Sequence, residues 1–212
     1  MATRRQLAQA GLVAAGLLPL LGLIVAFGLD RLGVEPVETI THETGDWALR
    51  LLLLTLLVTP LRRLLGWNAL APFRRTLGLL SFFYASLHFA TYLTFELGWH
   101  FTDLPKEIAE RPYITVGFAA FVILSALAMT STRGWIRRLA RNWQRLHRLV
   151  YLAVILAVVH FLWLVKADLR EPLIYAGIAA TLLAWRLPPL LERTKVNYAT
   201  LRGSAGRGRE TS

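Results

Sequence analysis

Residues 143–163, WQRLHRLVYLAVILAVVHFLW, decide how the rest of the chain is interpreted. The run is mostly apolar, has a histidine near each end, and is about as long as a membrane-spanning helix. Ionisable rings inside such a segment are costly to keep there, so they are functional candidates by default. We hypothesise that His147 and His160 hold haem. In a helix their spacing of 13 residues corresponds to about 20 Å, which places them near opposite sides of the hydrocarbon core.

Ideal helix geometry does not put these two histidines on one face. At about 100° per residue, the second ring is rotated by about 140° from the first. A bulge or kink would bring the rings to one side of the helix; without one, they face different neighbours. The sequence leaves both arrangements open.

The composition is that of a polytopic membrane protein. Of 212 residues, 55% are hydrophobic and 17% are charged, and several apolar runs of about 20 residues occur. The absence of cysteine excludes disulfides, iron–sulfur clusters, a haem thiolate and covalent haem attachment. We predict an all-α bundle of six transmembrane helices, with approximate bounds 8–29, 47–65, 76–97, 113–130, 146–166 and 171–187.

Charges segregate between alternate loops. The N-terminus, the loops after the second and fourth spans, and the tail from Arg186 hold 18 of the 24 basic residues. The other loops, together with the span ends that border them, hold 11 of the 13 acidic residues. The positive-inside rule then places both termini in the cytoplasm, and we expect the chain in the bacterial inner membrane. The net charge of +11 is therefore explained by topology and contact with lipid headgroups, not by nucleic acid.

The two ends of the chain frame one membrane domain. We interpret the first apolar run as a retained helix with a kink at Pro19; a cleaved signal peptide is the alternative. We assign residues 1–190 to the membrane domain. Residues 191–212 are polar and glycine-rich, and we expect them to form a loose cytoplasmic tail.

A second histidine matches His160 in depth. His88 lies about 20 Å into the third span if that helix enters near Arg75, and His160 lies at a similar depth in the fifth. Two neutral imidazoles at one depth on neighbouring helices can ligate one iron from both sides. The alternative is that each ring only hydrogen-bonds a neighbour in the bundle. We expect His42 to be a solvated residue of an acidic loop, 30–46, and His100 to lie in the outer interfacial zone.

Two segments carry a family resemblance. Residues 74–88, RRTLGLLSFFYASLH, and 143–152, WQRLHRLVYL, on a six-span chain of this length resemble the MsrQ family, also called YedZ. That family is the haem-binding membrane subunit of the bacterial periplasmic methionine sulfoxide reductase system. It belongs to the wider ferric reductase and NADPH oxidase-like transmembrane group. The resemblance covers about residues 8–190.

The resemblance implies a cofactor set and an electron path. The family binds haem b, and FMN is associated with it. It passes electrons from the quinol pool to a periplasmic molybdopterin-containing catalytic subunit that reduces methionine sulfoxide in oxidised proteins. The fifth span would supply His160 at an outer haem and His147 at an inner one, and the third span supplies His88 at the outer position. Arg74 stands at the inner position of the third span, so a second haem, FMN and a quinol stay open as alternatives for Arg74 and His147.

Within this sequence no flavin and nicotinamide domain follows the last span. We therefore expect electrons to come from quinol or a separate cytoplasmic flavin reductase, and the chain not to be catalytic alone. Two other functions remain: a stand-alone transmembrane ferric or quinone reductase, and a haem-free transporter or assembly scaffold. Glu96 is the one acidic residue expected inside a span, which argues against a proton-coupled carrier.

Overall fold

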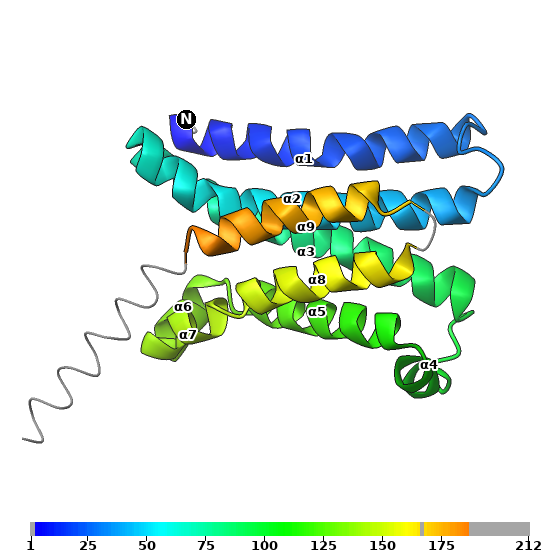
Figure 1. Ribbon diagram of the computed structural model, residues 1–212. Coiled ribbons are helices and arrows are strands. Elements are labelled where there is room, and N and C mark those ends of the chain that lie inside the picture. Colours follow the sequence, from blue (N-terminus) through cyan, green and yellow to red (C-terminus); the bar gives the residue numbers. More distant parts are fainter. Residues whose placement is uncertain (1–2, 166–167, 187–212) are drawn as a thin grey trace, which may run out of the picture.

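The computed structural model describes residues 3–165 and 168–186, and this part of the chain is helical, with no strand. The long helices run alternately in opposite directions and lie side by side (Figure 1). They are α1 (Arg4–Gly28), α2 (Pro36–Leu65), α3 (Phe73–Thr91), α5 (Pro112–Met129), α8 (Val150–Leu164) and α9 (Arg170–Ala184). The shorter elements are η1 (Asn68–Leu70), the π-helical η2 (Tyr92–Glu96), α4 (Leu104–Glu110), α6 (Arg133–Leu139) and α7 (Arg141–His147). The predicted all-α class is confirmed.

Four segments of the described residues are long and apolar enough to cross a membrane. They are Arg4–Gly28, Asn68–Glu96, Pro112–Met129 and Arg141–Leu164. Helix α2 is long but carries charged residues near both ends, and α9 has only 15 residues. Both helices pack among the other long helices. Because neither is one of the four candidate segments, the six-span arrangement stays a prediction.

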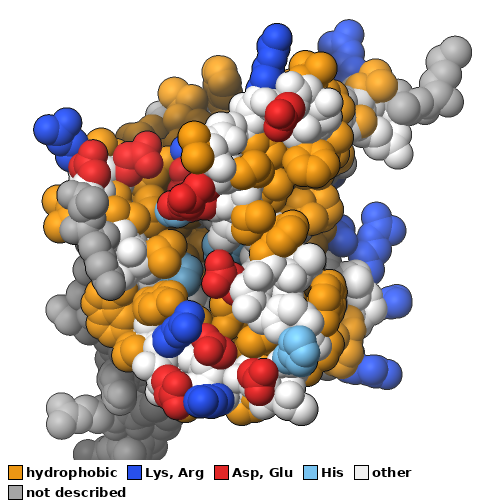
Figure 2. Space-filling view, turned by 90° about the vertical axis from the view of Figure 1, so that its right-hand side faces the viewer, with side chains coloured by type: hydrophobic (Ala, Val, Ile, Leu, Met, Phe, Trp, Pro, Cys, Tyr) orange, Lys and Arg blue, Asp and Glu red, His pale blue; other side chains and the backbone are white. Residues whose placement is uncertain are grey.

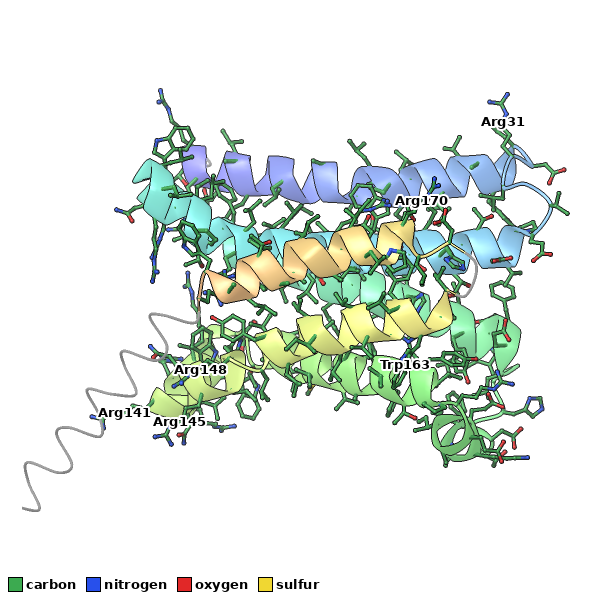
Figure 3. The ribbon with its side chains drawn as sticks, in the orientation of Figure 1. Arg31, Arg141, Arg145, Arg148, Trp163 and Arg170 are labelled. Atoms are coloured by element: carbon green, nitrogen blue, oxygen red, sulfur yellow. The ribbon has the colours of Figure 1, made fainter. Side chains whose placement is uncertain are left out.

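The two ends of the bundle differ in charge. The start of α1, the pair α6 and α7, and the end of α9 lie at one end (Figure 1), and Arg141, Arg145 and Arg148 are found there (Figure 3). We call this the basic end; the last turn of α2 and the first turn of α3 add four more arginines to it, Arg62, Arg63, Arg74 and Arg75. The opposite end, with α4 and the start of α2, carries most of the carboxylates and is called the acidic end.

Two packed helix pairs build the core. Helix α2 packs along α3, and α5 packs along α8, with α9 against α8 and α2. The larger buried cluster joins α2, α5, α8 and α9, and its most enclosed members are Leu52, Leu56, Ala153 and Val154. The smaller cluster joins α2 and α3 to α1. The core therefore ties the four helices α2, α3, α5 and α8 into a frame for any site between them.

A tyrosine docks α1 at its proline. Pro19 has no N–H, and at the next residue the Tyr84 hydroxyl from α3 inserts into the backbone hydrogen bonds of α1. Leu20 N donates to Tyr84 Oη at 3.1 Å, and Tyr84 Oη donates to Gly16 O at 2.8 Å. This contact gives α1 a defined place in the bundle, which supports the interpretation as a retained helix.

A second proline explains a buried arginine. Pro60 lies inside α2 and cannot donate to the carbonyl of Leu56, four residues earlier. The guanidinium of Arg186, which is only 8% exposed, donates to that carbonyl from the end of α9. It also donates to Leu182 O at 3.1 Å. The arginine thus satisfies a carbonyl that the proline leaves open and fastens α9 to α2.

One local expectation was wrong. Residues 30–46 are not one loop: α2 already begins at Pro36, because proline at the first helical position suits a helix start. In the fifth span, where the sequence left a bulge or kink open, a turn at residues 148–149 separates α7 from α8 within the segment Arg141–Leu164. His147 and His160 therefore lie on different helices. The tail assigned to 191–212 lies outside the described residues.

Candidate functional site

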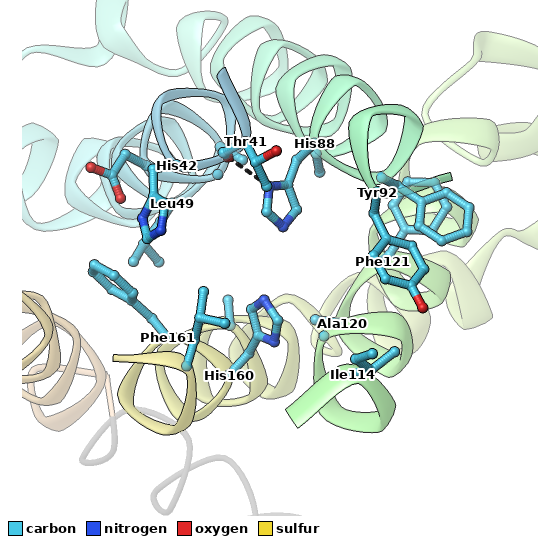
Figure 4. A pocket seen from close by; sticks show the side chains of 18 of the residues that line it. Thr41, His42, Leu49, His88, Tyr92, Ile114, Ala120, Phe121, His160 and Phe161 are labelled. Carbon is cyan, nitrogen blue, oxygen red and sulfur yellow. Dashed lines mark hydrogen bonds between the residues drawn. The ribbon is translucent and has the colours of Figure 1, made fainter. Parts of the chain in front are cut away.

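A large cavity lies between the two helix pairs, toward the acidic end. Its volume is about 670 Å³, within the range of about 300–1,000 Å³ usual for small-molecule and cofactor sites. Apolar side chains line the interior, among them Leu52, Ala85, Phe121, Leu124 and Ala157. His88 from α3 and His160 from α8 also line it, and Figure 4 shows their rings on opposite walls. The cavity is therefore an apolar chamber with two imidazoles directed into it.

His88 is held in one orientation by α2. Its Nδ1 lies 2.9 Å from the carbonyl oxygen of Thr41 (Figure 4). A carbonyl oxygen can only accept, so Nδ1 carries the proton and Nε2 keeps its lone pair. The ring lies directly on Gly45, where an added Cβ would be 3.0 Å from Nδ1. This helix surface thus fixes both the tautomer and the position of the ring.

His160 repeats the same arrangement on the other helix pair. Its Nδ1 lies 2.7 Å from the carbonyl oxygen of Tyr113, and an added Cβ on Gly117 would be 2.7 Å from that nitrogen. In both cases the carbonyl precedes the glycine by four residues, one helical turn. Each histidine therefore presents an unprotonated Nε2, and each is oriented by a carbonyl and a glycine of the preceding packed helix.

The spacing of the two rings suits one metal ion between them. Their centroids are 6.1 Å apart, with the planes at 77°. With imidazole–metal bonds of about 2.0 Å, and each centroid about 1.2 Å behind its nitrogen, two rings on opposite sides of one ion would have centroids about 6.4 Å apart. The prediction that His88 and His160 lie at one depth agrees with this pairing.

The donor set distinguishes haem from a bare metal ion. Among the described residues no group of three or more His, Cys, Asp or Glu side chains could hold a metal ion. Two imidazoles alone leave most coordination positions of a metal empty, whereas a porphyrin supplies four nitrogens and needs only axial ligands. The apolar walls fit a flat hydrophobic macrocycle. The residues present therefore fit haem, with His88 and His160 as the axial pair.

The mouth of the cavity is charged. Figure 2 looks onto the acidic end and shows histidine side chains in a hollow bordered by carboxylates. The lining residues there include Glu35, Glu38, Asp46 and Glu96, with Arg111 as a cation among them. Hydrogen bonding between the side chains of Glu35 and Glu38, and the charge of Glu38, raise the pKa of Glu35. The hydrogen bond to Tyr113 and the nearby Glu107 carboxylate raise the pKa of Arg111, which keeps it cationic.

His147 lies away from this chamber, at the basic end. Its ring stacks on Trp143 with centroids 4.0 Å apart, and its Nδ1 lies 3.2 Å from Trp143 O. Its Nε2 is buried and has no hydrogen-bond partner. Arg74 is exposed and near enough for its charge to affect His147. The structure thus brings Arg74 and His147 into one region but separates both from the His88 and His160 pair.

Of the two remaining histidines, His42 differs from its expected setting and His100 agrees with it. His42 lies on α2, lines the cavity mouth and is 3.6 Å from the Glu38 carboxylate, so its assignment to a loop was wrong. His100 is exposed at the acidic end and is bonded to Leu97 O, outside the cavity lining, as an interfacial residue would be. Sequence reasoning missed Gly45 and Gly117. Their one available signal was the shared spacing of 43 residues from each glycine to its histidine.

Comparison with known proteins gives the class. The profile of the family described as "Ferric reductase like transmembrane component" matches residues 44–158, more than half of the chain. The matched segment contains Gly45, His88, Gly117 and His147 and ends two residues before His160. The fold and this match define the class as a ferric reductase-like transmembrane component.

Curated relatives refine the class. A protein of Xanthomonas axonopodis pv. citri (strain 306) is 59% identical over 160 residues, which are 76% of this chain and 73% of the relative. One of Xanthomonas campestris pv. campestris (strain B100) is 56% identical over 84% of this chain and 80% of its own length. One of Herminiimonas arsenicoxydans is 48% identical, with coverages of 83% and 82%. All three are named "Protein-methionine-sulfoxide reductase heme-binding subunit MsrQ". The chain therefore belongs to the MsrQ family.

Proposed function

We propose that this chain is the haem-holding electron-transfer subunit of a methionine sulfoxide reductase system and spans the membrane six times. The observation that carries the proposal is the pairing of His88 and His160 across an apolar cavity, with each Nδ1 bonded to a backbone carbonyl. The names of the relatives, which state a heme-binding subunit, support the choice of haem.

The residues of the chain hold and insulate the cofactor. A b-type haem bound here would supply a one-electron carrier. The carbonyls of Thr41 and Tyr113 hold the two imidazoles with Nε2 unprotonated and make those nitrogens better donors, so that His88 and His160 would hold the haem iron. The apolar wall would keep water from the cofactor, and the ligand pair and the charges at the mouth would tune its potential.

The charge distribution gives the direction of transfer. With the basic end in the cytoplasm, the chamber opens toward the periplasm. We propose that electrons enter from quinol, or from a cytoplasmic flavin reductase, and leave at the acidic end. The acceptor is a periplasmic molybdopterin-containing catalytic subunit that repairs oxidised methionine residues in proteins, and the acidic end is its docking surface. The chain is then not catalytic alone.

The basic end is the proposed entry side. The unpartnered Nε2 of His147 can donate its lone pair to a metal ion or accept a hydrogen bond from a ligand, because Nδ1 carries the proton that is directed at a carbonyl. A second haem iron and a quinol hydroxyl both meet this requirement. FMN is included on the family resemblance, and the arginines of the basic end, Arg74 among them, offer cations for its phosphate.

A second candidate is a stand-alone ferric reductase, favoured by the description of the matching family. The two functions differ in the acceptor that oxidises the reduced chain. The test is to reconstitute the full chain in liposomes, reduce it with a quinol, and add either the purified catalytic subunit with a methionine sulfoxide peptide or ferric citrate. We expect reoxidation of the haem and formation of methionine only with the catalytic subunit. Equal or faster reoxidation by ferric citrate alone would favour the second candidate, and no reduction by quinol would contradict the proposed entry.

A further inference from the structure

We propose that Arg111 and Tyr92 form an anion-binding site at the cavity mouth, which takes a propionate of the haem. This inference rests on the proposed function, because it concerns the orientation of the haem between His88 and His160. It assigns a positioning role to two residues that neither the ligand pair nor the family resemblance involves.

Charge restricts where a propionate can lie. The mouth is lined by four carboxylate side chains, Glu35, Glu38, Asp46 and Glu96. Among the lining residues that the structure describes, Arg111 is the only arginine or lysine. A propionate placed against the carboxylates would be repelled, whereas one beside Arg111 gains a charge-assisted hydrogen bond. The haem edge that carries the propionates is therefore expected at the α4–α5 junction, where Arg111 lies.

Tyr92 provides a second donor with no present partner. Its hydroxyl is buried and makes no hydrogen bond, although Tyr92 lines the cavity. A buried hydroxyl without a partner destabilises the fold, so such a group needs a specific reason. Figure 4 shows Tyr92 reaching from its helix toward α5, and the charges that act on its hydroxyl are first the Glu107 carboxylate and then the Arg111 guanidinium, which are paired with each other. A carboxylate between Tyr92 and Arg111 would satisfy the hydroxyl and face the guanidinium.

Arg111 is already part of the local framework. Its Nε lies 3.1 Å from Glu107 Oε2, and its Nη1 is 3.5 Å from Tyr113 Oη. This leaves further N–H donors of the guanidinium to bind an anion, since the group has five. Two residues later, the carbonyl of Tyr113 orients His160. The same short segment would thus hold one axial ligand and one propionate of the same haem.

The test compares haem with its dimethyl ester, in which both propionates are neutral. Haem-free full chain is titrated with each compound, and the affinity and the midpoint potential are measured spectroscopically for wild type, Arg111→Leu and Lys106→Leu. Lys106 is exposed on α4 and does not line the cavity, so it controls for loss of one positive charge at this end. Arg111→Leu should weaken haem binding about tenfold and lower its midpoint potential, because a cation near the ferric form is lost. The affinity of the dimethyl ester for each variant should be within twofold of its affinity for wild type.

Two further variants separate a binding role from a folding role. Tyr92→Phe should weaken haem binding several-fold while leaving the haem-free protein as stable as wild type or more stable, because an unpartnered hydroxyl is removed. Glu107→Gln should raise the midpoint potential, because it frees Arg111 from its competing carboxylate. Equal weakening of haem and ester binding by Arg111→Leu would overturn the inference. Failure of the wild type to bind either compound would instead contradict the proposed function.

Discussion

His160 lies so close to Gly117 that a Cβ on the glycine would be 2.7 Å from the imidazole Nδ1. His88 and Gly45 form the equivalent contact at 3.0 Å. A real Cβ is essentially never found below 3.0 Å from another heavy atom, so the first contact admits only glycine. The second contact is also tight, but a Cβ on Gly45 would fit if the His88 ring shifted by a few tenths of an ångström. The two glycines are therefore part of the histidine site, and they differ in how strictly it needs them.

Alanine at the two glycines should give a graded loss of haem. Gly117→Ala displaces His160 from the Tyr113 carbonyl, and overpacking of this kind costs about 1–3 kcal/mol, which is roughly a 5- to 150-fold loss of affinity. Gly45→Ala should weaken haem binding less than Gly117→Ala does. Haem per chain and haem affinity in detergent-purified protein measure both effects.

The matched control is Gly177→Ala. Gly177 is also within a helix, and an added Cβ there meets nothing within 4 Å. Its haem content should equal that of wild type. A larger loss from Gly45→Ala than from Gly117→Ala, or a loss in the control, would refute the ranking.

The link between Arg186 and Pro60 predicts coupled effects on stability. Arg186→Leu leaves the Leu56 carbonyl without its donor and should lower the free energy of unfolding by about 1–3 kcal/mol. In a Pro60→Ala background, the new N–H can bond that carbonyl, so the same substitution should cost about 1 kcal/mol less. Denaturant unfolding of the four proteins in one detergent gives the coupling. Additive effects would show that the arginine does not compensate for the proline.

Part of this arrangement could be predicted from sequence. Hydropathy indicated the segments that became α1, α3, α5, α8 and α9, and the matched depths of His88 and His160 indicated their pairing. Depth is a one-dimensional property, and rise per residue fixes it. The glycine contacts, the Tyr84 hydroxyl inserted into α1 and the Arg186 bond were not predictable. Each joins residues far apart in sequence and depends on how helices pack side by side.

One error in the sequence interpretation has a local cause. Carboxylates near the start of α2 suggested a loop, although proline at its first position and packing against α3 allow helix to extend there. The sequence left a bulge or kink open within residues 143–163, and the chain turns at residues 148–149. Hydropathy cannot locate such a break, because the residues that follow the turn remain apolar.

His147 should be dispensable for the haem at the acidic end. Its ring stacks on Trp143 in α7, at the opposite end of the bundle, and its Nε2 has no hydrogen-bond partner among the described residues. We expect His147→Ala to keep at least one haem per chain, with the reduced-state bands of the His88 and His160 site unchanged. The pyridine haemochrome assay and a reduced-minus-oxidised spectrum measure this. Complete loss of haem in this variant would move the principal site to the basic end.

The most direct test of the central claim is the reduced-minus-oxidised visible spectrum of the detergent-purified chain, with haem per chain quantified for wild type, His88→Ala and His160→Ala. Wild type should show sharp low-spin b-type bands, as expected for an iron with two imidazole ligands. Each single variant should lose the low-spin signal of one haem. Wild-type spectra and haem content in both variants would contradict the assignment of His88 and His160 as the ligand pair.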